Sequence, residues 1–181
     1  ICAGSVWATL SQVWHQQSYS ISAIYNRTPD KAIRLAQETN SIVAESMTAV
    51  IDASDLIMLS VSDDAIESVA GLLTDCDWSG RGIFHVTGAK SLDVLRSIRD
   101  AGSMVGSLHP ALPFAGVESS VAGIAGATFA LESSHDLLKG WLVDLVRSVN
   151  GRVIEVASGK KAQYHTALVF ASNYMVTLYA T

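Results

Sequence analysis

The sequence of 181 residues is poor in cysteine and proline, and it has no cluster of basic residues. Cys2 and Cys76 are its only cysteines, and their spacing matches neither a disulfide framework nor a metal site. We therefore expect a cytoplasmic protein without a metal. The formal net charge is −5, which argues against nucleic acid or an anionic membrane surface as a partner.

A long, uniformly apolar run is also missing. The most apolar stretch covers residues 162–180, but it contains Gln163, His165 and Asn173 as well as several serines and threonines. A helix that crosses a bilayer would be more uniformly apolar. We therefore predict a helix buried in a core or an interface, and no membrane partner.

The sequence does contain a regular alternation of two patterns. Short apolar runs rich in β-branched residues alternate with segments of helical periodicity, which is typical of βαβ units around a parallel sheet. The predicted fold class is α/β, a Rossmann-like doubly wound and mostly parallel sheet. The expected strands cover residues 20–26, 41–44, 55–61, 81–86, 103–108, 127–132 and 153–156. The expected helices cover residues 5–17, 63–73, 92–101, 134–149 and about 160 to the end, and another opens at residues 28–30.

Two element boundaries follow from particular residues. The strand 103–108 is expected to break at His109 and Pro110, because proline removes a backbone donor and restricts the residue before it. Ser133 or Ser134 is the expected N-cap of the helix 134–149, since serine hydroxyls accept hydrogen bonds from the first free amides of a helix.

Residues 2–7 stand where a G-x-G-x-x-G turn would place backbone amides and a helix N-terminus against a pyrophosphate. Only Gly4, the middle glycine, is present. Cys2 and Trp7 occupy the other two glycine positions, and an indole at position 7 should push the helix away or swing into the nucleotide site. An ordinary strand-to-helix connection remains the alternative. The candidate cofactor-binding residues in this turn are Ala3, Gly4, Ser5 and Val6.

The end of the second expected strand carries Asn26, Arg27 and Thr28. An acidic residue at this point favours NAD, whereas an arginine near the 2′-phosphate favours NADP. The guanidinium of Arg27 offers a planar fork of donors that matches phosphate, and no carboxylate stands beside it. The sequence therefore predicts NADP as the cofactor, with a simple surface arginine as the alternative.

Polar residues follow the other strands at the edge where ligands bind in open α/β sheets. His109 is a candidate for catalysis or substrate contact. His85, inside an apolar strand, fits a packed histidine better, and Asp63 and Asp64 fit helix N-terminal carboxylates that the helix dipole favours. The further candidates for the cofactor site are Ser60, Val61, Ser62, Thr87 and Gly88.

Three segments resemble a known family. Residues 84–89 are similar to its His-Thr-Ser-Gly-Ala segment, residues 105–110 to its Gly-Ser-Leu-His-Pro segment, and residues 164–174 to its Tyr-His-x-Ala-x-x-Phe-Ala-Ser-Asn-Tyr helix. Together they resemble the bacterial Rossmann-like family whose C-terminal part is domain of unknown function 2520. The resemblance implies a Rossmann domain followed by an all-helical domain through which two copies dimerise. It implies a fold shared with pyrroline-5-carboxylate reductase, prephenate dehydrogenase and the 6-phosphogluconate and 3-hydroxyisobutyrate dehydrogenases.

The expected domain boundary lies near residues 157–159. Residues 1–157 are expected to form the Rossmann-like NADP-binding domain, and residues 158–181 the first helix of a truncated C-terminal dimerisation domain. A helix that starts at Ser5 needs a strand in front of it, and in a doubly wound sheet this first strand is central. We therefore expect the strand upstream of Ile1 and further helix after Thr181.

The last helix places Lys161, His165, Val169, Ser172 and Val176 on one stripe, with Asn173 at its edge. We expect His109 and His165 to flank a small-molecule substrate, because histidine can supply a proton near neutral pH. Asn173, with Ser172, would position the substrate or the nicotinamide amide. A stripe that forms only interface core is the alternative.

The leading functional hypothesis is a reductase or dehydrogenase that transfers a hydride between NADPH and a small carbonyl or imine substrate. The family turn is usually Gly-Ala-Gly-x-Val-Gly, and this chain departs from it at Cys2 and Trp7. That departure favours a second hypothesis, a non-catalytic dimerising or ligand-sensing protein with a degenerate nucleotide loop. A flavin- or deazaflavin-dependent protein is a third possibility that no residue distinguishes.

Overall fold

The computed structural model describes residues 1, 4–112, 117–157 and 159–171. Its strands are β1 (Ala23–Ile24), β2 (Ile42–Val43), β3 (Leu56–Leu59), β4 (Gly82–His85), β5 (Met104–Pro110), β6 (Thr128–Ser133) and β7 (Arg152–Glu155). Its α-helices are α1 (Ser5–Gln16), α2 (Pro29–Thr39), α3 (Met47–Asp52), α4 (Ile66–Gly71), α5 (Arg96–Asp100), α6 (Val117–Ile124), α7 (Asp136–Ser148) and α8 (Lys161–Val169). Two 3₁₀ turns, η1 (Asp63–Ala65) and η2 (Leu92–Leu95), lead into α4 and α5.

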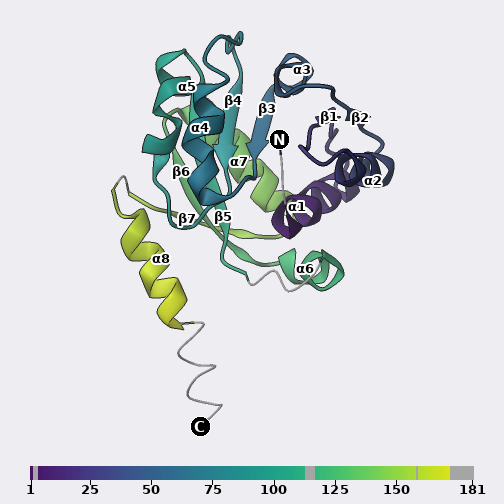
Figure 1. Cartoon of the computed structure of the whole chain (residues 1–181). Coiled ribbons are helices and arrows are strands. Elements are labelled where there is room, and N and C mark those ends of the chain that lie inside the picture. Colours follow the sequence, from purple (N-terminus) through teal and green to yellow (C-terminus); the bar gives the residue numbers. More distant parts are fainter. Residues whose placement is uncertain (2–3, 113–116, 158, 172–181) are drawn as a thin grey trace.

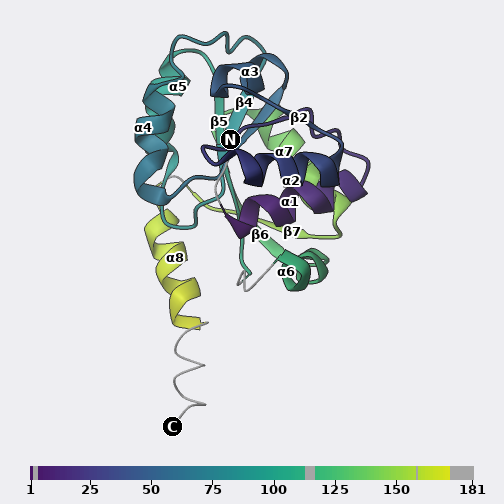
Figure 2. The ribbon, with the colours of Figure 1, turned by 45° about the vertical axis from the view of Figure 1, so that its right-hand side comes forward.

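Five strands form the main sheet in the order β3-β4-β5-β6-β7, and β1 and β2 pair in a separate parallel sheet. The pairs β3–β4, β4–β5 and β6–β7 are parallel, and β5–β6 is antiparallel. Helices cover both faces of the main sheet, and α8 extends away from the rest of the molecule (Figures 1 and 2). This arrangement confirms the predicted α/β fold with a mostly parallel sheet.

Side chains alternate between the two faces of the main sheet and divide its core in two. On one face, Ile83 and Val105 pack in a cluster with residues of α3, α4, η2 and α5. On the other face, Phe84 and Leu108 pack with residues of α1, α6 and α7. Because both faces are buried, the central strands are almost continuously apolar, as the sequence pattern indicated.

The prediction that β5 breaks at His109 and Pro110 was wrong. The strand continues through both residues, which pair with Ala130 and Phe129 of β6. The amide of Ala111 donates to the carbonyl of Thr128, so the nitrogen of Pro110 faces the opposite edge of β5. The pairing of β4 with β5 has already ended at Ser107, and the missing donor of Pro110 therefore interrupts no ladder.

The N-cap of α7 is His135, not Ser133 or Ser134 as predicted. The Nδ1 atom of His135 accepts a hydrogen bond of 3.2 Å from the amide of Leu137. Ser134 is engaged elsewhere, because its hydroxyl accepts from the amide of Val105 in β5. The sequence pattern also gave no indication of the short helices α3 and α6.

Ile1 lies at the free edge of β3. Its terminal nitrogen donates to the carbonyl of Met58, and its carbonyl accepts from the amide of Ser60. A cavity of about 230 Å³ lies next to it and is lined by residues of both β1 and β3. The strand expected in front of Ser5 concerns residues upstream of Ile1 and stays a prediction.

Among the described residues, none of the helices combines the length and the apolar character needed to span a bilayer.

Candidate functional site

The turn that follows β1 is fixed by its own side chains. The amide of Thr28 donates to Oδ1 of Asn26 at 2.9 Å, and Pro29 then occupies the first turn of α2, where its missing donor costs no hydrogen bond. Asn26 is buried, and its Nδ2 atom has no hydrogen-bond partner within the described chain. The side chains of Arg27 and Thr28 are exposed. The turn therefore presents unsatisfied donors next to a free guanidinium.

These residues border a cavity of about 540 Å³, which we call the Arg27 pocket. Its walls include two cations, Arg27 and Lys31, and no carboxylate stands among its described lining residues. Its apolar side comes from α3, from the segment after β3, from η1 and from α4, and is formed by Met47, Val61, Ala65 and Val69. An apolar wall beside two cations matches the mixed character of a phosphorylated nucleoside. Lys31, in the first turn of α2, is a candidate that the sequence analysis missed.

Gly4 adopts φ 135° and ψ −177°, a backbone conformation that L-residues with side chains rarely adopt. It is the N-cap of α1, and no side chain caps that end of the helix. The amides of Ser5 and Val6, in the first turn, therefore remain available to an anion. Ala3 lies outside the described residues. The retained glycine fits a phosphate turn.

Trp7 does not enter the Arg27 pocket. Its side chain is buried in a cluster with Ile24 of β1 and with Ala32, Leu35 and Ala36 of α2. The indole therefore fills the space between α1 and α2. Ala32 and Ala36 leave room for the indole on the side of α2, but Trp7 also lines a cavity of about 530 Å³ together with Gly4, Ser5 and Lys31, next to the candidate phosphate turn.

The candidates after β3 and β4 divide between two places. Val61 and Ser62 line the Arg27 pocket, whereas Ser60 is buried and bonded to Ile1. Thr87 donates from Oγ1 to Oδ2 of Asp63 at 2.7 Å, and this bond ties the end of β4 to the end of β3. The hydroxyl of Thr87 also accepts from the amide of Ala89 at 3.2 Å, which orders the turn that carries Gly88.

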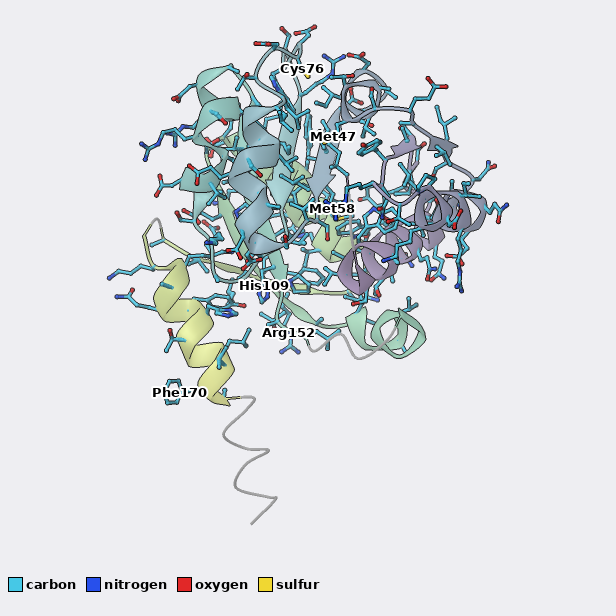
Figure 3. The ribbon with its side chains drawn as sticks, in the orientation of Figure 1. Met47, Met58, Cys76, His109, Arg152 and Phe170 are labelled. Carbon is cyan, nitrogen blue, oxygen red and sulfur yellow. The ribbon has the colours of Figure 1, made fainter. Side chains whose placement is uncertain are left out.

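His109 and His165, the histidine pair, lie close together, and the substrate contact predicted for them stays a prediction. Their ring centroids lie 6.2 Å apart with an interplanar angle of 80°. A Cβ atom placed on Gly88 would lie 2.7 Å from Nε2 of His109 and 2.7 Å from Nδ1 of His165, so both nitrogens converge on that glycine. The Nδ1 atom of His165 is buried without a hydrogen-bond partner in the described structure. Figure 3 shows His109 at the lower end of the sheet next to α8, with Cys76 at the opposite end of the molecule.

Tyr164 is a further residue of this site that the sequence analysis quoted only as part of a motif. Its hydroxyl lies 3.3 Å from Nδ1 of His109, and the two rings meet edge to face with centroids 5.9 Å apart. Burial raises the pKa of the Tyr164 hydroxyl, which keeps it protonated at neutral pH. A signal for Tyr164 was present, since it precedes His165 on the same turn of the expected helix.

Burial, and to a smaller extent the Lys161 cation, lower the pKa of His109 to about 4. At neutral pH the His109 imidazole is therefore uncharged. A neutral imidazole can donate one N–H hydrogen bond, but it is not the protonated acid that the sequence argument assumed for this residue.

A row of buried polar residues lies beneath the histidine pair. His85, Ser107 and Glu132 are neighbours across β4, β5 and β6, and all three are buried. Lys161, at the start of α8, donates to the hydroxyl of Ser107 at 2.5 Å. Burial lowers the pKa of His85 to about 3, so it remains neutral, as expected of a packed histidine. The sequence analysis placed Lys161 on the helix stripe without assigning it a partner.

The other members of that stripe come later in the chain. Ser172, Asn173 and Val176 lie outside the described residues, so the role predicted for Asn173 stays a prediction. Val169 is 37% exposed, whereas Lys161, at the start of the stripe, is buried. Among the described residues, no group of three or more histidines, cysteines, aspartates or glutamates is arranged to hold a metal ion.

Two family models match the chain. One, described as a Rossmann-like domain, matches residues 1–110. The other, described as a domain of unknown function, DUF2520, matches residues 127–181. No curated protein matches the chain.

Several solved structures share its fold. A Bacteroides fragilis protein assigned as a candidate NADP oxidoreductase has a TM-score of 0.81 and 20% identity, covering 98% of this chain and 67% of its own. Pyrroline-5-carboxylate reductase from Coxiella burnetii has a TM-score of 0.75 and 17% identity, with 97% and 64% covered. Prephenate dehydrogenase from Aquifex aeolicus, in complex with hydroxyphenyl propionate and NAD⁺, has a TM-score of 0.71 and 15% identity, with 86% and 58% covered. The chain thus spans about two thirds or less of the length of these structures, and at these identities they bear on the fold alone.

Proposed function

The chain belongs to the Rossmann-like domain family, and from that premise we propose that it is an oxidoreductase that uses NADP to interconvert a small carbonyl or imine compound and its reduced form. The observation that carries this proposal is the position of two sites at one edge of the parallel strands. The Arg27 pocket carries two cations, and the histidine pair converges on Gly88. An anion-binding pocket and a polar reaction site at this edge match the general plan of ligand binding in open α/β sheets.

The residues of the first site fit a phosphorylated dinucleotide. The Arg27 fork and the Lys31 ammonium would hold the 2′-phosphate, and the unpartnered Nδ2 of Asn26 would donate to the ribose or its phosphate. The α1 N-terminus at Gly4, with the amides of Ser5 and Val6, would hold the pyrophosphate. The relatives by fold include proteins named for NADP and for NAD⁺, so the choice of NADP depends on these residues.

At the second site the side chains would polarise the substrate. When bound, NADPH supplies the hydride, and the protein contributes orientation and electrostatics. The Tyr164 hydroxyl, by donating to Nδ1 of His109, would place the imidazole proton on Nε2, which faces Gly88. A neutral Nε2–H directed at the substrate heteroatom stabilises the negative charge that develops there. His165, whose Nδ1 has no hydrogen-bond partner in the described structure, would transfer a proton to or from the substrate heteroatom.

Binding of NADPH to the intact protein tests the cofactor assignment. Tryptophan fluorescence, quenched by the nicotinamide, gives a dissociation constant for the wild type and for Arg27→Ala. Because hydrogen bonds between charged groups contribute about 1.5–3 kcal/mol, we expect Arg27→Ala to weaken NADPH binding about 10- to 100-fold and NADH binding only slightly. Arg147→Ala is the matched control, because the Arg147 side chain is 75% exposed and pairs with Asp144 on α7. Equal weakening of both nucleotides would remove Arg27 from the 2′-phosphate site.

A non-catalytic, ligand-sensing role is the second candidate, favoured by the loss of two glycines at Cys2 and Trp7. NADPH binding without turnover of any carbonyl or imine substrate would support it.

In either role we propose that the C-terminal helices join two copies of the chain. Phe170, 53% exposed at the end of α8, points away from the sheet in Figure 3. Sedimentation at several concentrations would test this dimer, with a monomer at all of them as the contrary result.

A further inference from the structure

The buried polar row crosses three strands at one level. His85 is in register with Ser107, and Ser107 is in register with Glu132. Paired residues of adjacent strands project from the same face of a sheet, so the three side chains lie side by side. They are 0%, 0% and 7% exposed, respectively. A buried row of this kind costs free energy unless its charges are compensated.

Lys161 enters this row from α8. It is 1% exposed and is the only buried residue of that helix. Its ammonium donates to Ser107, and the Glu132 carboxylate stabilises its charge. The attachment of α8 thus differs from that of the other long helices, α1, α2 and α7, each of which buries several apolar residues.

The spacing of the contacts links this attachment to the histidine pair. Along β5, His109 follows Ser107 by two residues on the same face, a distance of about 6.6 Å. Along α8, Tyr164 and His165 follow Lys161 by three and four residues, which is one turn and about 5–6 Å. The two intervals match. When Lys161 contacts Ser107, the next turn of α8 therefore places Tyr164 and His165 over His109.

We propose that Lys161 is a positioning residue, whose bond to Ser107 inside the buried polar row fixes the register of α8 on β5 and thereby brings Tyr164 and His165 to His109. The inference rests on the proposed function only for the reaction that the assembled site would serve. The contact itself is a property of the fold and can be tested without turnover.

The test compares two variants that break the Lys161–Ser107 contact with a neighbouring control variant, all in the full chain. Ser107→Ala removes the acceptor and keeps both charges. The double variant Lys161→Met, Glu132→Gln removes the ammonium and leaves no uncompensated buried carboxylate. Lys160→Met is the control, because Lys160 adjoins Lys161 but is exposed. Hydrogen exchange of the α8 and α7 amides, NMR titration of the His109 ring and NADPH affinity are the measurements.

For both variants that break the Lys161–Ser107 contact, we expect the amide exchange rates in α8 to increase at least about tenfold, while those in α7 change less than about twofold. We expect the pKa of His109 to move upward from its lowered value, since burial by α8 is relieved and, in the double variant, the nearby cation is gone. The control should change neither quantity. A folded Ser107→Ala protein with unchanged α8 exchange and unchanged His109 titration would overturn the proposal, even if the double variant failed to fold. NADPH affinity reports separately on the proposed function. A wild-type protein that does not bind NADPH would contradict the cofactor site but not the positioning role of Lys161.

Discussion

The Arg27 pocket and the histidine pair lie at the same edge of the parallel strands and differ in how they treat charge. In the pocket, exposed cations stand in contact with solvent, and the described lining residues include no carboxylate. At the histidine pair, the groups are sheltered, and burial removes the charge of the His109 ring. A charged pocket suits a ligand that arrives charged, whereas neutral, partly desolvated groups suit a step in which charge develops during the reaction. The comparison predicts that changes to one region leave the other largely intact.

Trp7→Ala gives the largest expected change and tests whether the indole serves the fold or the nucleotide. The side chain is 4% exposed and packs between α1 and α2, so its removal should lower the free energy of unfolding by about 3–5 kcal/mol. Denaturant titration measures this loss. The indole lies outside the Arg27 pocket but lines the cavity beside Gly4 and Ser5, so the NADPH affinity of the folded protein decides between the two roles: a change within about threefold would assign Trp7 to the fold alone. A tenfold change in that affinity would assign Trp7 to the nucleotide site.

Acidification should lower the free energy of unfolding through His85, which lies in the buried polar row beneath the histidine pair. Its pKa in the folded protein, about 3, lies below the usual value near 6.5, so the unfolded chain binds the proton first as the pH falls. Stability is therefore fully present above pH ~6.5 and is lost toward the folded pKa, by up to about 3 kcal/mol between pH 7 and 4.5. Urea titrations of the wild type and of His85→Gln at both pH values isolate this contribution. The loss should be smaller in the variant, and equal losses would show that His85 is not the group responsible.

Gly88→Ala should separate the histidine pair. A methyl group there would lie 2.7 Å from both facing nitrogens, so at least one ring must move. A displacement of about 1 Å at a reacting site costs about 100-fold in rate, which is near 2.7 kcal/mol. We expect kcat with any turned-over carbonyl or imine substrate to fall by about that factor, while the free energy of unfolding changes little.

Gly71→Ala is the matched control for this substitution, because an added Cβ at Gly71 meets nothing within 4 Å. NMR shifts of the His109 and His165 rings provide a second measurement that does not need a substrate. Unchanged shifts in Gly88→Ala would contradict the crowding inferred at this glycine.

The two regions were also not equally predictable from the sequence. Local sequence signals indicated the turn that borders the Arg27 pocket, because the strand, the proline at the start of the next helix and the residues between them are neighbours in the chain. The histidine pair was predictable because His109 lies near the carboxyl end of a strand and His165 lies on a helical stripe. The partners of Lys161 were not, because Ser107 and Glu132 are distant in sequence and meet only through strand register.

Other departures have the same origin in tertiary structure. Pro110 continues β5 because its ring nitrogen faces an edge where β4 has ended, which no local pattern indicates. Ser134 fails to cap α7 because its hydroxyl bonds to β5. The lowered pKa of His109 depends on burial beneath α8 and on Lys161, and residue type alone suggested an ordinary value.

Lys31→Ala should give the smallest change, and it tests how far the exposed region depends on charge. Lys31 is exposed, and exposed ion pairs contribute about 0.2–1 kcal/mol, so NADPH binding should weaken about two- to fivefold. NADH binding should be unaffected if the ammonium meets the 2′-phosphate. Since salt screens such pairs, the difference should shrink between about 0.05 and 0.5 M salt, with Lys160→Ala as an exposed lysine outside the pocket. A loss of affinity that is equally large for NADH, or that persists at high salt, would mean that Lys31 shapes the pocket by packing. Arg27 would then be the one described cation of the pocket that binds through its charge.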